Sequence, residues 1–118
     1  MRYRNSIFVV LALVGLSTGT HVNAEDISII GAWRGQYAES CAAVKEGRTE
    51  DFVKISKKQI ERYEGDCGII RQVAKGDRHE LQILCETEGE TVRDTLKIKV
   101  ISRDQIDIEG AGRYDRCE

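Results

Sequence analysis

The chain has 118 residues, and its 18 basic and 20 acidic side chains leave a formal net charge of −2. Charges of both signs are interspersed along the sequence without a basic block, so the concentrated positive charge typical of nucleic-acid binders and of membrane-surface segments is missing. We therefore expect neither nucleic acid nor a membrane surface among its partners.

Residues 1–24 have the pattern of a secretory signal peptide. Arg2 and Arg4 form a short basic region, an apolar run follows from Ile7 to Leu16, and Val22-Asn23-Ala24 fits a small-residue cleavage site. The apolar run is shorter than the roughly 20 residues that span a bilayer, although a membrane anchor is the alternative. We predict a signal peptide over 1–24 and one periplasmic or secreted domain over 25–118.

The first elements of that domain are predicted to be a strand and a short helix. Ala32 to Tyr37 alternates apolar with polar residues, which places Trp33, Gly35 and Tyr37 on one face of a strand. Trp33 is the only tryptophan, and we expect it to anchor the core. Ser40 to Gly47 predicts a single helical turn with Ser40 as N-cap.

Two further strands are predicted before residue 65. Asp51 to Ser56 indicates a strand with Val53 and Ile55 facing inward, and Ile60 to Glu64 indicates its partner. The register between them is ambiguous from the sequence. A helix over Lys57 to Tyr63 is the alternative.

Residues 67–85 predict a hairpin around which the remaining strands can be arranged. Gly76-Asp77 is suited to a two-residue turn, because glycine adopts a positive φ without a steric penalty. With this turn Cys67 and Cys85 fall one position out of register, and a one-residue bulge would place them opposite each other.

An even number of cysteines in an exported chain of this size predicts a disulfide framework. Three pairings of four cysteines are possible, and the hairpin favours Cys67–Cys85, which leaves Cys41 with Cys117. A zinc site is the alternative, but the cysteines lack the short spacing that zinc sites use. We expect neither a metal nor a cofactor.

The last third of the chain predicts three more strands. Glu88-Gly89 is suited to a two-residue turn that sets Leu81 opposite Leu96. The next turn, at Ser102 to Asp104, is predicted to hold three residues, because a two-residue turn would send the following isoleucines to the opposite face.

Together these elements predict an all-β domain, an antiparallel meander of about seven or eight strands. A Cys41–Cys117 bond would draw the first and last strands together, so we expect closure into a small barrel or a flattened sandwich. The aliphatic residues expected to fill it are Leu81, Ile83, Leu96, Ile98, Val100, Ile106 and Ile108.

Few residues suit catalysis, and we predict no enzymatic activity and no catalytic residue. His79 is the one histidine after residue 24, and beside a tight turn we expect it to be solvated. Cysteines held in disulfides offer no thiolate. Glu86, Glu88 and Glu90 surround one turn, where we expect a solvated tip; a calcium site or a glycosidase pair are the alternatives.

Binding is the function that remains, and tyrosine and arginine are enriched at interface hot spots. The candidate binding residues are Tyr37, Tyr63, Tyr114, Arg62, Arg113 and Arg116. For each tyrosine the alternative is a place at the edge of the core with its hydroxyl in water.

Four short motifs mark the chain after residue 24: G-x-W at Gly31 to Trp33, E-x-x-C at Glu64 to Cys67, C-E-x-E-G at Cys85 to Gly89, and Y-x-x-C at Tyr114 to Cys117. With the signal peptide, this arrangement resembles small uncharacterised exported proteins of Gram-negative bacteria. More loosely, the size and the cross-linked barrel are similar to periplasmic inhibitors of lysozyme and of metalloproteases.

We therefore expect a non-enzymatic periplasmic or secreted protein that recognises a macromolecular target, such as a hydrolase that it inhibits. The alternative is a carrier of a small apolar ligand inside the barrel, and a third hypothesis is a hydrolase that uses the turn carboxylates.

Overall fold

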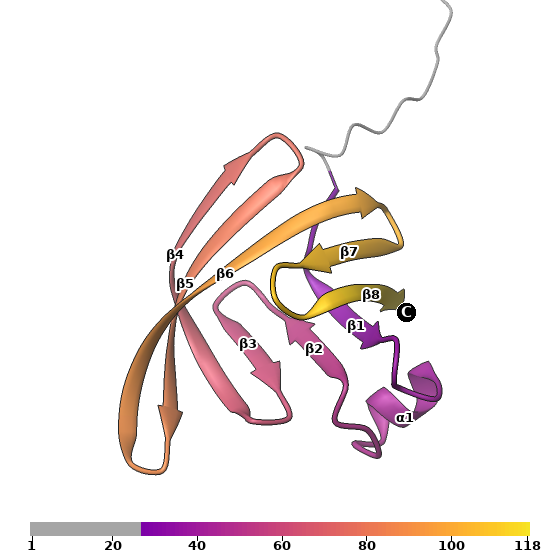
Figure 1. The fold of residues 1–118 in the computed structure, drawn as a ribbon, viewed down its shortest axis with the longest axis horizontal. Coiled ribbons are helices and arrows are strands. Elements are labelled where there is room, and N and C mark those ends of the chain that lie inside the picture. Colours follow the sequence, from indigo (N-terminus) through magenta and orange to yellow (C-terminus); the bar gives the residue numbers. More distant parts are fainter. Residues whose placement is uncertain (1–26) are drawn as a thin grey trace, which may run out of the picture.

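The structure is a computed structural model that describes residues 27–118, so the predicted signal peptide lies outside the described residues. Its elements are β1 (Gly31–Gly35), α1 (Cys41–Lys45), β2 (Phe52–Ile55), β3 (Gln59–Arg62), β4 (Gly65–Lys75), β5 (Arg78–Thr87), β6 (Glu90–Ser102), β7 (Gln105–Ile108) and β8 (Gly112–Cys117). Each strand pairs antiparallel with the next, and β8 pairs with β1, so the sheet closes into a barrel (Figure 1). The predicted all-β meander is confirmed, and between the two predicted forms of closure it adopts the barrel.

Alternate residues of the strands fill the barrel interior. The seven aliphatic residues predicted to face inward are all buried, and Trp33 is fully buried among them. The indole Nε1 of Trp33 donates a hydrogen bond to the carbonyl of Ile29 at 2.9 Å. The segment before β1 therefore folds against the core, with Ile29 also buried.

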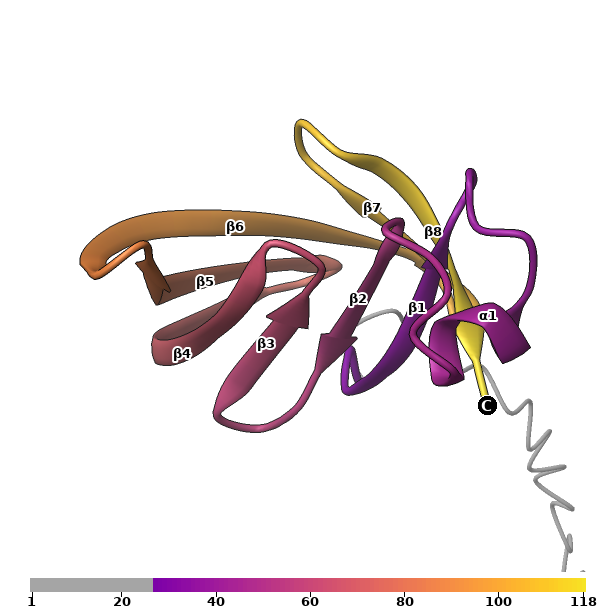
Figure 2. The ribbon, with the colours of Figure 1, turned by 90° about the horizontal axis from the view of Figure 1, so that it is seen from below.

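Two disulfides cross-link the barrel as predicted. Cys67 of β4 is paired directly with Cys85 of β5, and their Cα atoms are 4.2 Å apart. Cys41, the first residue of α1, is bonded to Cys117 at the end of β8, with 5.5 Å between the Cα atoms. Figure 2 shows α1 beside the end of β8, where this bond attaches it to the outside of the barrel.

The predicted bulge in the β4–β5 hairpin is confirmed. Ile69 pairs with Ile83 and Arg71 pairs with Gln82, so one extra residue stands in β4 between them. This shift brings the cysteines into register while keeping the tight turn at Gly76-Asp77.

The turn between β6 and β7 differs from the prediction. It holds two residues rather than three, because Ser102 pairs directly with Gln105. A register shift between Val100 and Ser102 supplies the extra residue, so Val100 still faces Ile106 inside the barrel. The hydrophobic phase was predicted correctly, but the residue that preserves it lies in the strand and not in the turn.

The first strand is shorter than predicted. It ends at Gly35, and Tyr37 is 82% exposed instead of sharing the face of Trp33. A Cβ atom at position 35 would overlap the carboxylate of Asp51, and the backbone N–H of Tyr37 donates to Asp51 Oδ2 at 2.8 Å. This contact turns the chain out of the sheet.

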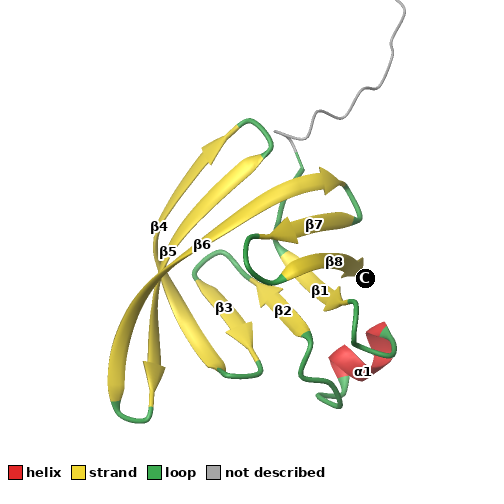
Figure 3. Cartoon of the chain, viewed as in Figure 1, coloured by secondary structure: helices red, strands yellow, loops and turns green. Residues whose placement is uncertain are grey.

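The other early elements follow the sequence pattern, and Figure 3 shows α1 as the one helix in the described part of the chain. The hydroxyl of Ser40 accepts a hydrogen bond from the N–H of Ala43 at 3.1 Å, which is the predicted N-cap. β3 is a strand and not the alternative helix, with Ile60 paired to Ile55.

The strands β4, β5 and β6 have 11, 10 and 13 residues, whereas the other strands have four to six. β3 pairs only with Gly65–Gly68 of β4. The second half of β4 therefore extends past β3, and together with the start of β5 it forms an arm of the sheet (Figure 1).

Candidate functional site

An open groove of about 590 Å³ crosses the outer faces of β4, β5, β6 and β7, and we call it the outer groove. Its lining is mainly charged, with an excess of basic side chains. The basic residues that line it are Arg71, Lys75, Arg78, Lys97 and Lys99. The acidic ones are Glu80, Asp107 and Glu109.

The strand register collects positive charge into one row across the sheet. Lys75 of β4 pairs with Arg78 of β5, and Arg78 pairs with Lys99 of β6. The row continues through Asp107 of β7 to Arg113 of β8. We call these five residues the basic row. No ion pair within 4.0 Å engages any of them in the described segment 27–118.

The neighbouring row on the same face has one basic and two acidic side chains. Glu80 of β5 lies opposite Lys97 of β6, and the Lys97 ammonium is 3.9 Å from a carboxylate oxygen of Glu109. The uncompensated positive charge of the outer groove is therefore concentrated in the basic row, toward the β4–β5 turn.

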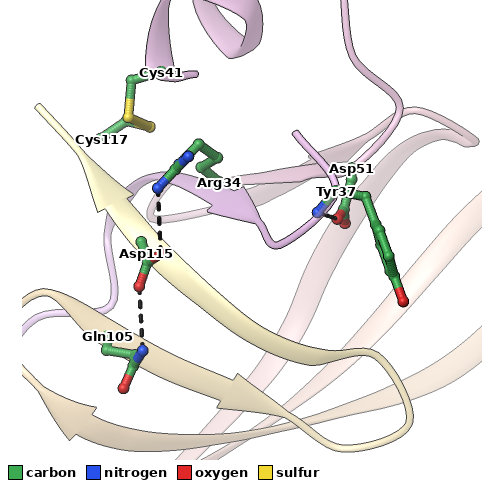
Figure 4. Close-up of polar contacts among 7 residues, drawn as sticks. All are labelled: Arg34, Tyr37, Cys41, Asp51, Gln105, Asp115 and Cys117. Carbon is green, nitrogen blue, oxygen red and sulfur yellow. Dashed lines mark hydrogen bonds and ion pairs between the residues drawn. A yellow bond between two sulfur atoms is a disulfide. The ribbon is translucent and has the colours of Figure 1, made fainter. Parts of the chain in front are cut away.

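Arg113 is the candidate binding residue that lies in the basic row, and a polar network holds it there (Figure 4 shows the core of this network). Its guanidinium donates to Oε1 of Gln105 at 3.4 Å. The amide of Gln105 donates to Asp115 at 3.2 Å, and Asp115 forms an ion pair with Arg34 of β1 at 3.4 Å. The network joins β7, β8 and β1 on the outside of the barrel.

Arg116 points to the interior, and each of its three guanidinium nitrogens donates a hydrogen bond within the chain. Its guanidinium lies 4.2 Å from the centre of the Trp33 ring. It donates to the backbone carbonyls of Arg103, Ile30 and Ser28 at 2.7, 3.0 and 2.6 Å. These bonds tie β8 to the β6–β7 turn and to the segment before β1.

Arg62 and Tyr114 lie near the other end of the barrel. A nitrogen of the Arg62 guanidinium is 3.4 and 3.5 Å from the sulfur atoms of Cys67 and Cys85. Tyr114 is largely buried, and burial raises the pKa of its phenol; the negative charge of Asp51 raises it further, while the positive charge of Arg62 acts in the opposite direction.

The six candidate binding residues therefore do not form one patch. Tyr37 and Tyr63 are exposed in turns, and Tyr37 borders a separate hollow of about 460 Å³ beside Arg48 and Asp51. Lys75, Arg78 and Lys99 were not among the candidates. The predicted hairpin registers already placed them side by side, so the signal was present in the sequence.

His79 lies under the outer groove and corrects another expectation. It is only 8% exposed, points into the barrel beside Ile98, and has Nδ1 3.3 Å from the amide nitrogen of Gln72. Its Nε2 is buried without a hydrogen-bond partner in the described structure, and burial lowers the pKa of the imidazole. Alternation with the buried residues Leu81 and Ile83 indicates this inward position.

Glu86, Glu88 and Glu90 are exposed around the β5–β6 turn, as expected of a solvated tip. Within residues 27–118, no group of three or more histidine, cysteine or carboxylate side chains is arranged to hold a metal ion. In the same segment, no helix has both the length and the apolar character needed to cross a bilayer. Comparison of the chain with protein-family models, with curated proteins and with solved structures finds no match.

Proposed function

We propose that the protein is a non-enzymatic periplasmic or secreted binding protein that recognises a macromolecular target, for instance a hydrolase that it inhibits, through the outer groove. The observation that carries this proposal is the basic row. Lys75, Arg78 and Lys99 stand next to one another on three adjacent strands without a described ion pair.

Like charges placed directly opposite each other destabilise a sheet. Asp107 is the one acidic member of the row, so the repulsion is only partly offset within the chain. An acidic partner surface laid over the row would relieve the repulsion and add favourable contacts, and complementary charge also accelerates association. Because the row stands on paired strands and not on loops, its spacing is fixed before the partner arrives.

The interior of the barrel supports a surface binder more than a carrier of a small ligand. The space in which such a ligand would lie is filled by fully buried side chains, namely those of Trp33, Ile60, Leu81, Ile83 and Ile106. The two disulfides suit folding in an oxidising compartment, and the signal peptide predicted over 1–24 would deliver the chain there.

The test compares capture of partners by two variants with equal changes in charge. K75E/R78E/K99E reverses the basic row, whereas K45E/K57E/K58E reverses three exposed lysines outside the outer groove. Folded wild-type protein and both variants are immobilised, exposed to periplasmic and secreted extracts, and the retained proteins are identified by mass spectrometry.

We expect a partner that wild-type protein and K45E/K57E/K58E retain and that K75E/R78E/K99E loses, with retention falling as salt is raised. Circular dichroism establishes that both variants remain folded. Equal retention of every captured protein by the two variants would refute a role for the basic row.

A further inference from the structure

One edge of β4 has no partner strand in the described structure. The backbone N–H of Ile69 donates to the carbonyl of Lys58 at 2.8 Å, and this is the last backbone hydrogen bond described between β4 and the β2–β3 turn. From Ile70 to Lys75, β4 pairs only with β5. We call residues 70–75 the β4 edge, and their backbone groups on the side away from β5 are available to an added strand.

The β4 edge borders the outer groove. Arg71, Val73 and Lys75 line the groove, whereas Gln72 and Ala74 belong to the opposite face, because they pair with Leu81 and His79. Six residues of strand extend roughly 20 Å, which is the length of an average β-strand. A segment added here would place every second side chain over the groove.

We propose that the β4 edge binds an extended acidic peptide segment of the target as an additional strand, with its acidic side chains over the outer groove near Arg71 and Lys75. This inference rests on the proposed function, since it uses the same groove. Strand addition supplies backbone hydrogen bonds along the edge, and alternate side chains supply specificity.

Charge selects this occupant over a second copy of the chain. If two β4 edges paired antiparallel about Val73, Arg71 of each copy would lie opposite Lys75 of the other, and like charges in that position repel. Charged residues on an edge strand protect it from self-association in this way. An acidic strand has the opposite effect, because its carboxylates meet Arg71 and Lys75 at the edge and Arg78 and Lys99 beyond it.

A polyanion without a peptide backbone would match only half of the site. A nucleic acid or an acidic glycan could neutralise the basic side chains, but it could not continue the ladder of N–H and C=O groups along the β4 edge. An acidic peptide in the extended conformation can both neutralise the basic side chains and hydrogen-bond to the backbone of the β4 edge.

The experiment uses synthetic peptides and the folded, oxidised protein. The first probe is a fluorescent hexapeptide that alternates glutamate with valine. The second has the same sequence with alternate backbone nitrogens methylated, which removes hydrogen-bond donors and keeps the charge. A heparin fragment and a single-stranded oligonucleotide are the polyanion probes. Binding is measured by fluorescence anisotropy and competition, and amide hydrogen exchange locates the site.

We expect the alternating peptide to bind and to slow exchange of amides in residues 70–75. R71E/K75E should weaken this binding at least tenfold, while K45E/R48E, with the same change in charge at exposed residues in and after α1, should leave it within twofold. N-methylation of the peptide should also weaken binding at least tenfold. Circular dichroism and unfolding midpoints establish that both variants are folded.

The outcomes separate this inference from the proposed function. If N-methylation has no effect and the polyanions compete as well as the peptide, strand addition is refuted while recognition through the basic row stands. If sedimentation shows a dimer whose residues 70–75 are protected without peptide, a second copy occupies the edge and the inference is also refuted. If no probe binds and reversal of the basic row changes no captured partner, both proposals fail.

Discussion

Breaking the Cys41–Cys117 disulfide should destabilise the protein more than breaking the Cys67–Cys85 disulfide. The first bond joins residues 76 positions apart and the second joins residues 18 positions apart. In the chain-entropy model, a cross-link restricts the unfolded chain by an amount that grows with the logarithm of the loop length. At 25 °C the two loops correspond to about 4.5 and about 3.2 kcal/mol of unfolding free energy.

Replacing cysteines would confuse this comparison, because Cys67 and Cys85 are buried in the barrel and their truncation would also leave a cavity. Reduction in single-disulfide backgrounds avoids that problem. In C67A/C85A, reduction breaks only the Cys41–Cys117 bond, and in C41A/C117A it breaks only the other. No atom is removed between the oxidised and reduced forms of either variant.

The assay is urea unfolding of each variant in its oxidised and reduced forms. Trp33 is the only tryptophan and is fully buried, so its fluorescence reports opening of the core. Sucrose in every sample keeps the reduced forms folded. We expect the loss on reduction to be larger in C67A/C85A, by about 1.3 kcal/mol, with a larger m-value because the unfolded chain expands. A larger loss in C41A/C117A would refute the reasoning from loop length.

Three further predictions concern single residues. Burial lowers the pKa of His79, so as the pH falls the unfolded chain binds a proton at this residue near pH 6.5, before the folded chain does. The unfolding free energy should therefore be highest above pH 6.5 and decline as the pH falls toward the lowered pKa. H79Q should show a weaker decline in the urea midpoint between pH 8 and 5. G35A should cost about 1–3 kcal/mol in the same assay, because the new methyl group overlaps the Asp51 carboxylate, and a G35A/D51A variant should recover part of the loss. Glu88 has a φ of +51° in a two-residue turn, so E88N should raise the unfolding free energy by about 0.5–1 kcal/mol in chemical denaturation. Equal pH profiles for H79Q and wild type, a neutral G35A or a destabilising E88N would each contradict its argument.

The sequence was sufficient to predict most strand pairings, because alternation of buried and exposed residues admits one register. Leu81 opposite Leu96 is an example, since a slip by one residue would expose both. The position of an extra residue is less determined. A bulge at Ile101 and a longer turn preserve the same phase, so alternation alone could not distinguish them.

Two corrections show where local pattern is insufficient. The exit of the chain at Tyr37 depends on Asp51, which is 14 positions away, and nothing in the sequence near Tyr37 indicates that contact. His79 was different, because its alternation with Leu81 pointed inward while the nearby turn suggested exposure. The burial pattern was the better guide, because His79 lies opposite the buried Ile98 of β6.

The candidate site was only partly predictable. Lys75 and Arg78 are separated by a two-residue turn, whereas Arg78 and Lys99 are separated by most of β5, a second two-residue turn and most of β6, so their charges look interspersed in the sequence and adjacent in the sheet. The registers alone give this row. The outer groove depends on how β4 to β7 curve, and the unpaired β4 edge depends on β3 covering only Gly65–Gly68. Neither feature has a signature in the residue pattern.

Because β8 pairs with both β7 and β1, closure of the barrel depends on the last strand of the sheet. Arg34 and Asp115 lie 81 positions apart, and Arg116 and Cys117 make their contacts from the same strand. A nascent chain that has formed only β1 to β7 retains two unpaired strand edges, and such edges promote aggregation. Barrel closure therefore waits for β8, because this strand supplies the pairing with β1, the bond to Cys41 and the contacts of Arg116.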